Sequence, residues 1–396
     1  MAIQISDRMR DMTPSAIREI LKTNTPISFS AGNPSPETFP AKELGLLAAE
    51  IFEKEFATAL QYGLTEGYGP LRELTKSRMR DKYGIGGEDD ELIIVSGGAQ
   101  GIDLAAKCLL NEGDVVICEN PSYVGALLDY RSHRARLVGV DMDAHGMDME
   151  ALARVLQVEK RAKVIYTIPT FQNPMGVTMP LERRKRLVEL AVKYDVMILE
   201  DSPYFELRYE GAPVPCVKSL DTTGHVLFSG SFSKVVAPGL RTGYVCGPKA
   251  LISKMVVAKQ GQDVHTNLLS MMLIARFLER YDLDAHIARC CALYREKRDR
   301  MLKNLETHVD ARVSFTRPEG GLFLWGQLPE GFTGTEFSRA AADRGVAVVP
   351  GMAFDVAENP ENRGFRVNFS LPALEQIDAG TVILGETFAR LANSRD

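Results

Sequence analysis

The sequence lacks the features that mark secreted, membrane-spanning and nucleic-acid-binding proteins. Its six cysteines among 396 residues show neither C-x-x-C spacing nor the density of a disulfide framework, so we expect reduced thiols and a cytoplasmic protein. No stretch approaches the ~18 consecutive apolar residues of a membrane span, and the N-terminus carries charges where a signal peptide needs an apolar segment. The net charge of −5 means that basic residues are not in excess, which argues against a nucleic-acid partner.

Two further absences narrow the class of protein. The six histidines are dispersed, with no H-E-x-x-H or other paired spacing, so we expect no metal site. The chain has no low-complexity tract and no internal repeat with a period of about 20–50 residues, which argues against a solenoid. An ordinary globular architecture remains.

Short β-branched apolar runs recur through the middle of the chain and predict a sheet. Seven of them begin at Leu92, Val115, Arg136, Lys163, Val196, His225 and Thr242. Because they are continuous rather than alternating in polarity, both faces of the sheet should be covered. Amphipathic helical patterns, such as those over 99–110 and 180–195, separate several of them. Strand and helix repeated in this way predict an α/β fold with a mostly parallel sheet.

The length and a change of pattern near residue 285 predict two domains. At 396 residues the chain exceeds the ~250–300 residues at which a single core usually stops growing. A long charged helical segment over 284–309 is followed by strand-like pieces and a helical tail. We expect a large domain over 49–284 and a smaller α+β domain over 285–396. Residues 1–48 should form an N-terminal arm and part of the small domain.

One lysine, Lys234, lies in the unusual stretch "SGSFSKVVAPGLRTGY". Its hydroxyls, from Ser231 and Ser233 among others, and the guanidinium of Arg241 suit a phosphate group. A lysine amine beside a phosphate clamp is what a pyridoxal-phosphate enzyme requires. Two alternatives are a plain surface lysine and the Ser-x-x-Lys pair of serine acylases. The acylases also need S-D-N and K-T-G elements, which this chain lacks.

Polar residues follow two neighbouring strands and could serve the same cofactor. Asp201 ends the apolar run "VMILED", where a carboxylate could hold the protonated ring nitrogen; its alternative role is a helix N-cap. Asn173 in "PTFQNPMG" and Tyr204 in "DSPYFE" offer an amide and a hydroxyl to the phenolic oxygen. The alternative for Asn173 is turn chemistry, because Asn-Pro favours turns.

Two more stretches offer a phosphate site and an aromatic platform. In "SGGAQ", Gly98 opens a predicted helix, whose first amides could bind a phosphate along the helix dipole. Tyr123 in "ENPSYVGA" follows another strand and could stack on a planar ring. The alternative for Tyr123 is a packed core tyrosine.

The order of these motifs resembles the fold-type I pyridoxal-phosphate aminotransferases of class I and II. The resemblance covers nearly the whole chain, from "AGNPSPETFP" through "QYGLTEGYGPLREL" to "FRVNFS". "SAIREIL", "PTFQNPMG", "GSFSKVVAPGLRTGY" and "KQGQDVHTN" are most similar to the subgroup of 2-aminoadipate, kynurenine and broad aromatic aminotransferases. The resemblance implies a large cofactor-binding domain with a mostly parallel seven-stranded sheet between helices, and a smaller α+β domain.

The resemblance also implies roles for individual residues. Lys234 would form the internal aldimine and then shuttle a proton. Asp201 would hold the ring nitrogen, Asn173 and Tyr204 the phenolic oxygen, and Tyr123 would stack on the ring. The phosphate cup would consist of Gly98, Ala99, Gln100, Ser231, Ser233 and Arg241. Tyr62 would reach the phosphate of the neighbouring subunit, which implies a homodimer with shared active sites.

Substrate recognition is implied by the same likeness. Arg366 in "FRVNFS" would bind the α-carboxylate, assisted by Asn173, since a guanidinium pairs with a carboxylate through two hydrogen bonds. Ser15 and Arg18 in "SAIREIL", with Gly32 in "AGNPSP", would lie beside the substrate. Arg18 either reads a distal carboxylate or belongs to a solvated helix face.

The expected function is a pyridoxal 5'-phosphate-dependent aminotransferase. It would move the amino group of a 2-aminoadipate, aromatic or branched-chain amino acid to a 2-oxo acid such as 2-oxoglutarate, through pyridoxamine phosphate. One alternative is another fold-type I reaction, such as a lyase or decarboxylase, because the same cup serves them all. The other is a non-catalytic amino-acid-sensing module. A sensor fused to a DNA-binding head would carry a basic helix-turn-helix segment, whereas the core here is expected to begin almost at Met1.

Overall fold

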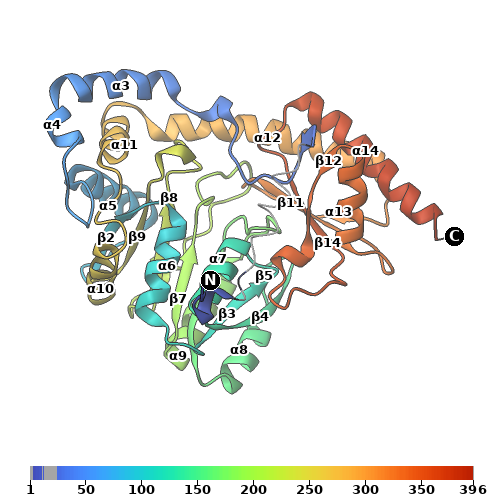
Figure 1. Ribbon diagram of the computed structural model, residues 1–396, viewed down its shortest axis with the longest axis horizontal. Helices are drawn as coiled ribbons and strands as arrows, with labels where there is room; N and C mark the ends of the chain where they lie inside the picture. The colour runs from blue at the N-terminus through green and yellow to red at the C-terminus, as the bar shows by residue number, and fades with distance from the viewer. Residues whose placement is uncertain (1–2, 11, 13–24, 396) are drawn as a thin grey trace.

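The structure is a computed structural model, and it describes residues 3–10, 12 and 25–395. Its largest element is an eight-stranded sheet in the order β2-β9-β8-β7-β6-β3-β4-β5 (Figure 1). The strands in this order are β2 (Asp90–Val95), β9 (Gly243–Pro248), β8 (Val226–Ser231), β7 (Met197–Asp201), β6 (Ala162–Thr167), β3 (Val115–Asn120), β4 (Arg136–Asp143) and β5 (Gly146–Met147). The pairs from β8 to β4 are parallel, while β9 and β5 run antiparallel to their neighbours.

All seven predicted apolar runs lie in this one sheet, which confirms the α/β fold with a mostly parallel sheet. The prediction of seven strands is one short, because β5 is a two-residue strand that returns antiparallel to the end of β4. A strand this short has no apolar run of its own, so the sequence pattern does not reveal it.

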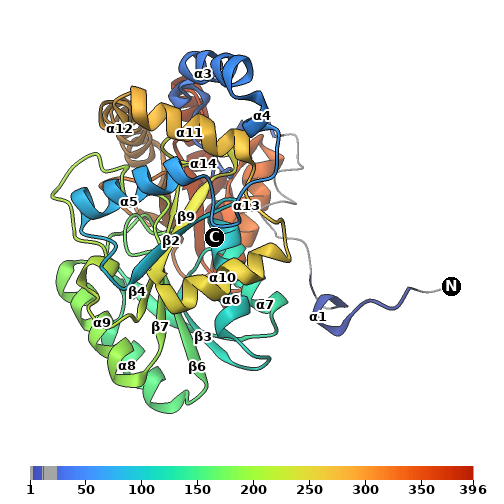
Figure 2. The ribbon, with the colours of Figure 1, turned by 90° about the vertical axis from the view of Figure 1, so that its left-hand side faces the viewer.

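Helices cover both faces of the sheet (Figures 1 and 2). Alternate residues of a strand belong to different core clusters: Val116 and Cys118 of β3 lie in one, and Val115 and Ile117 in the other. The first cluster includes residues of α6 (Gly98–Leu109) and α11 (Leu268–Arg280). The second includes residues of α8 (Met149–Val158) and α9 (Leu181–Tyr194). Two buried faces explain why the strands are continuously apolar.

A second, smaller sheet is built from the C-terminal part of the chain. Its four antiparallel strands have the order β10-β11-β14-β13. They are β10 (Ser314–Phe315), β11 (Phe323–Gln327), β14 (Gly364–Asn368) and β13 (Val349–Pro350). The same part of the chain contains three helices, α12 (Leu283–His308), α13 (Gly334–Asp343) and α14 (Leu374–Asn393). β1 (Ile27–Ser28) pairs with β12 (Val346–Ala347), so the N-terminal segment lies beside this C-terminal part.

Both predicted domain boundaries fall inside helices. Residues 48 and 49 lie within α3 (Ala41–Lys54), whose Glu50 pairs with Arg280 of α11. Residues 284 and 285 lie in the first turn of α12, where Asp284 pairs with Arg78 of α5 (Gly69–Tyr83) at 2.6 Å. Each expected boundary therefore cuts a continuous helix, and the division into domains stays a prediction. None of the helices within the described ranges is long and apolar enough to cross a membrane.

Candidate active site

A cavity of about 250 Å³ lies beyond the carboxyl ends of the parallel strands. Its wall consists of Asn33, Gly98, Ala99, Ile102, Tyr123, Ile168, Asn173, Asp201, Pro203, Tyr204, Ser231, Ser233, Lys234, Pro238 and Arg241. All predicted cofactor-binding residues are in this wall except Gln100 and Tyr62. A larger hollow of about 830 Å³ lies against Met175 and Trp325, but its wall holds none of the predicted site residues. The chemistry is therefore concentrated in the smaller cavity.

Lys234 follows β8 and borders this cavity. Its Nζ donates a hydrogen bond of 2.9 Å to the carbonyl oxygen of Gly32 and lies 5.8 Å from the ring centre of Tyr204. Burial of the ammonium, with the charges of Arg366 and Arg241, lowers the pKa of Lys234 to about 8. An appreciable fraction of the amine is therefore unprotonated near neutral pH and can act as a nucleophile or base.

Asp201 is the last residue of β7 and is buried at the floor of the site. Burial raises the pKa of its carboxyl to about 6, against the hydrogen bond from Tyr166 and the charge of Lys234, which lower it. The Tyr166 hydroxyl donates to Asp201 Oδ2 at 2.8 Å. No helix begins directly after Asp201, so the N-cap alternative does not apply. A buried carboxylate here can hold a protonated nitrogen.

Arg366 and Asn173 form a buried pair beside the cavity. Arg366 Nη1 donates to Asn173 Oδ1 at 2.9 Å, and its Nη2 donates to the Ser30 carbonyl at 2.7 Å. The guanidinium carbon lies 4.2 Å from the ring centre of Phe323 and 4.9 Å from that of Phe354. Burial lowers the pKa of Arg366 to about 10, so the group stays cationic at neutral pH. Its strand, β14, lies inside the small sheet, between β11 and β13, so Arg366 is not a surface arginine at a sheet edge.

The start of α6 and Arg241 form the opposite end of the cavity. Gly97, at the helix N-cap, has no side chain to satisfy the first amides of α6, so these amides can bind an anion. Arg241 Nη2 donates to the Ser96 carbonyl at 3.2 Å. A Cβ at Gly97, whose φ is +87°, would lie 2.4 Å from this nitrogen. Glycine is required here so that Arg241 can approach the backbone.

The polar groups of the cavity fit pyridoxal phosphate. They include an amine, a carboxylate, an amide, a phenol, hydroxyls and a guanidinium, from Lys234, Asp201, Asn173, Tyr204, Ser231, Ser233 and Arg241. Next to the cavity, the buried Ser229 Oγ has no hydrogen-bond partner among the described residues. A Cβ on Gly98 would lie 3.9 Å from that oxygen and 3.9 Å from Asp201 Oδ1. Space and one unpartnered hydroxyl therefore remain where a ring nitrogen would meet Asp201.

Some predicted residues lie elsewhere. The Gln100 side chain is one layer behind the cavity wall, where its Oε1 accepts from Lys259 at 2.8 Å, so its place in the phosphate cup stays a prediction that depends on its backbone amide. Tyr62 is 80% exposed, so its own chain does not enclose it. Its ring packs edge-on against the ring of His265. Gly32 contributes its carbonyl, as described above. Ser15 and Arg18 lie outside the described residues.

Three site residues escaped the sequence analysis. Tyr166, inside the strand-like run from Lys163, supports Asp201. Glu119 at the end of β3 accepts from Gln172 Nε2 at 3.1 Å and from the Ile168 amide at 3.1 Å. Burial raises the pKa of Glu119 to about 7. Gln172 Nε2 also donates to the Pro121 carbonyl at 2.9 Å, so Glu119 and Gln172 join the loops that carry Tyr123 and Asn173. Tyr166 and Glu119 each place a polar group inside or at the end of an apolar run, but this signal does not identify the partner of either.

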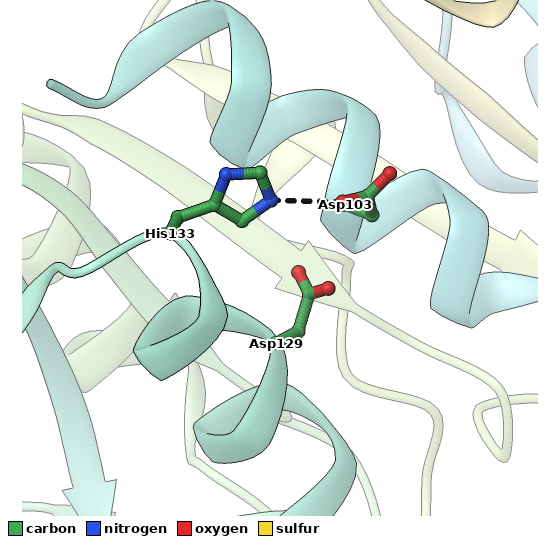
Figure 3. A group of neighbouring side chains, drawn as sticks. All are labelled: Asp103, Asp129 and His133. Carbon is green, nitrogen blue, oxygen red and sulfur yellow. Dashed lines mark hydrogen bonds and ion pairs between the residues drawn. The ribbon is translucent and has the colours of Figure 1, made fainter. Parts of the chain in front are cut away.

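One group of possible metal ligands occurs in the described part of the chain: Asp103, Asp129 and His133 (Figure 3). His133 Nε2 lies 2.8 Å from Asp103 Oδ1, and Lys107 Nζ donates to Asp103 Oδ2 at 3.0 Å. Asp103 already has cationic and polar partners, and none of the three residues lines the cavity. We interpret the group as a cluster of polar contacts between α6 and α7 (Val124–Ser132).

Three kinds of comparison relate the chain to known aminotransferases. The family model of aminotransferases of class I and II matches residues 24–379. An aromatic-amino-acid aminotransferase of Thermococcus litoralis is 41% identical over 389 residues, which are 96% of this chain and 93% of that protein. The crystal structure of a multiple substrate aminotransferase from Thermococcus profundus is similar with a TM-score of 0.94, at 38% identity and 98% coverage of both chains. That of the α-aminoadipate aminotransferase of Thermus thermophilus, complexed with N-(5'-phosphopyridoxyl)-L-leucine, has a TM-score of 0.91 at 36% identity and 98% coverage of both.

Proposed function

The chain belongs to the class I and II aminotransferases, and from this premise we propose that its amino donors are L-amino acids of the 2-aminoadipate, aromatic or branched-chain type. It is a pyridoxal-phosphate-dependent enzyme that passes the amino group to a 2-oxo acid; we propose 2-oxoglutarate as acceptor. Two relatives support the donor range, since one is named for aromatic amino acids and the other for α-aminoadipate.

The proposed substrate site depends on the Arg366–Asn173 pair. A guanidinium offers two parallel N–H groups to a carboxylate, and Arg366 Nε is buried without a partner among the described residues. The rings of Phe323 and Phe354 hold the guanidinium plane. The α-carboxylate of the donor therefore has a buried, preorganised cation beside the cavity that contains Lys234.

The cofactor would be held at both ends by residues of this wall. We assign its ring nitrogen to Asp201, its phenolic oxygen to Asn173 and Tyr204, and its phosphate to Arg241 and the start of α6. When bound, pyridoxal phosphate supplies an electron sink for the substrate Cα. Lys234 Nζ would be its covalent attachment point and, once displaced, the base that takes the proton from Cα. The lowered pKa of Lys234 suits that task because the amine must be unprotonated to accept a proton.

A homodimer with shared active sites is part of the proposal. Large apolar side chains are exposed along α3, α4 (Phe56–Ala59) and the following loop: Leu46, Phe52, Phe56, Leu60, Tyr62 and Leu64. Several large apolar side chains exposed on consecutive elements are typical of a protein interface. A second copy of the chain would cover it and bring Tyr62 toward the neighbouring cavity. Sedimentation of the full chain should give twice the monomer mass.

We also propose a cytoplasmic location and a division into large and small domains near residues 48 and 285. All six cysteines are free thiols, which suits a reducing compartment. The two separate sheets support the division into domains.

The single observation that carries the proposal is the buried Arg366–Asn173 pair next to a lysine of lowered pKa. The test is a single turnover of the cofactor-loaded enzyme with one amino acid and no 2-oxo acid. Transamination should yield about one oxo acid per subunit, with no carbon dioxide or free ammonia, and 2-oxoglutarate should restart the reaction. Release of carbon dioxide would indicate a decarboxylase, and release of ammonia a lyase. Absence of turnover with every amino acid would favour a sensor. Lys234→Ala is the inactive control.

A further inference from the structure

Lys259, near the C-terminal end of α10 (Lys249–Gln260), is a fully buried cation that the aminotransferase reaction does not explain. Its Nζ donates to Gln100 Oε1 at 2.8 Å, to Asp263 Oδ1 at 2.8 Å and to Thr266 Oγ1 at 3.1 Å. A lysine is almost never fully buried unless its charge is paired. Here each of the three N–H groups has an acceptor, so the side chain is held in one position.

The partners of Lys259 converge on Ser96. The Ser96 hydroxyl donates to Asp263 Oδ2 at 2.7 Å, and the Ser96 amide donates to Gln100 Oε1 at 2.8 Å. Gln100 Nε2 donates to Asp263 Oδ2 at 2.8 Å, which closes the network. Ser96 is therefore fixed at two atoms by groups that Lys259 itself holds.

Ser96 in turn carries the phosphate end of the cavity. Its carbonyl accepts the 3.2 Å bond from Arg241, and Gly97 and Gly98, which begin α6, follow it directly. Gly97 touches the Arg241 guanidinium so closely that a Cβ would not fit. A shift of Ser96 would therefore move both Arg241 and the first amides of α6.

We propose that Lys259 is a positioning residue for the cofactor phosphate. It locks Gln100 and Asp263, and these lock Ser96, so that Arg241 and the start of α6 bind the phosphate without rearrangement. The inference rests on the proposed function, because it assigns the phosphate to this end of the cavity. The inference also gives the Gln100 side chain a role, because it holds Ser96 from behind the cavity wall.

The test compares two ligands that differ only in the phosphate group. Cofactor-free full-length protein is dialysed to equilibrium against pyridoxal 5'-phosphate and, separately, against pyridoxal. Lys259→Met keeps the length of the side chain but removes its charge and donors. We expect it to weaken pyridoxal 5'-phosphate binding about tenfold, since a buried network loses one partner, and to leave pyridoxal binding unchanged. Lys254→Met, at an exposed position of the same helix, should match the wild type for both ligands.

The comparison separates a positioning role from a structural one. If Lys259→Met weakened both ligands equally, or neither, the inference would be wrong. Should that variant not fold, Ser96→Ala, which removes the hydroxyl and its contacts with Asp263 and Thr266, carries the same two expectations. A wild-type chain that bound neither ligand would overturn the proposed function, and this inference with it. If the wild-type chain binds both ligands and the variants bind them equally well, this inference alone is overturned.

Discussion

The hydroxyl of Tyr166 donates a 2.8 Å hydrogen bond to Asp201 Oδ2, and neither side chain has appreciable contact with solvent. Burial pushes the pKa of Asp201 up to about 6, whereas the Tyr166 bond acts in the opposite direction. A carboxylate can hold a protonated ring nitrogen only when it is ionised. Tyr166 therefore keeps Asp201 in its working form near neutral pH, although its hydroxyl does not line the cavity.

Replacing Tyr166 by phenylalanine should shift the pH dependence of cofactor binding. Loss of the donor raises the pKa of Asp201 further, so the carboxyl is protonated at a higher pH. Affinity for pyridoxal 5'-phosphate is measured by equilibrium dialysis of the cofactor-free protein. As the pH is lowered, it should begin to fall at a pH about one unit higher than in the wild type. Tyr130→Phe is the matched control, because the Tyr130 hydroxyl is buried without a partner among the described residues. Equal profiles for Tyr166→Phe and the wild type would contradict this.

Capture of the cofactor by Lys234 should depend on pH with a midpoint near the lowered pKa of about 8. Only the free amine forms the covalent bond, so the second-order rate should rise with pH through about 8 and then level off, whereas an ordinary lysine would level off near ~10.4. Stopped-flow absorbance of the cofactor measures this rate. Arg366→Gln removes a cation that lowers the pKa of Lys234, so its midpoint should move to higher pH. A rate still rising steeply above pH 9 in the wild type would rule out the lowered pKa.

Arg366→Lys should reduce kcat/KM for the amino donor by about a hundredfold. Lysine keeps the charge but loses the planar pair of donors and the stacking between Phe323 and Phe354. Steady-state kinetics with each donor class would show the effect, and Arg363→Lys, just before the same strand, should change kcat/KM little. If both variants lost the same amount, the α-carboxylate would have to bind elsewhere.

Much of the architecture could be predicted from the sequence because continuous apolar runs and helix periodicity are local signals. Lys234, Asp201 and Asn173 could be found because they follow such runs, and the carboxyl ends of parallel strands meet at one edge of the sheet. Gln100 shows the limit. It is adjacent in sequence to the cavity residue Ala99, but its direction depends on Lys259, which is 159 residues away. Tyr166 is similar, since nothing within its own strand indicates that its hydroxyl meets Asp201 on the next.

Gly97→Ala should damage the phosphate end of the cavity. The left-handed φ of +87° disfavours alanine, and the added Cβ would displace the Arg241 guanidinium. We expect at least about tenfold weaker binding of pyridoxal 5'-phosphate and a lower melting temperature, measured by dialysis and calorimetry. Gly239→Ala, in the same loop as Arg241, has no atom within 4 Å of the new Cβ and should bind normally. Normal binding by Gly97→Ala would show that Arg241 does not depend on this close approach.

The proposed role of Tyr62 can be tested by mixing two defective subunits. Its side chain is 80% exposed in one chain, yet we assign it to the phosphate of the neighbouring subunit. Tyr62→Phe should bind pyridoxal 5'-phosphate more weakly, and Lys234→Ala should be inactive. In a mixed dimer, the subunit with an intact Lys234 receives an intact Tyr62 from its Lys234→Ala partner, so one complete site forms. Activity at low cofactor concentration should therefore rise when the two variants are mixed and allowed to exchange subunits. Activity that merely equals the sum of the separate variants would place Tyr62 outside the active site.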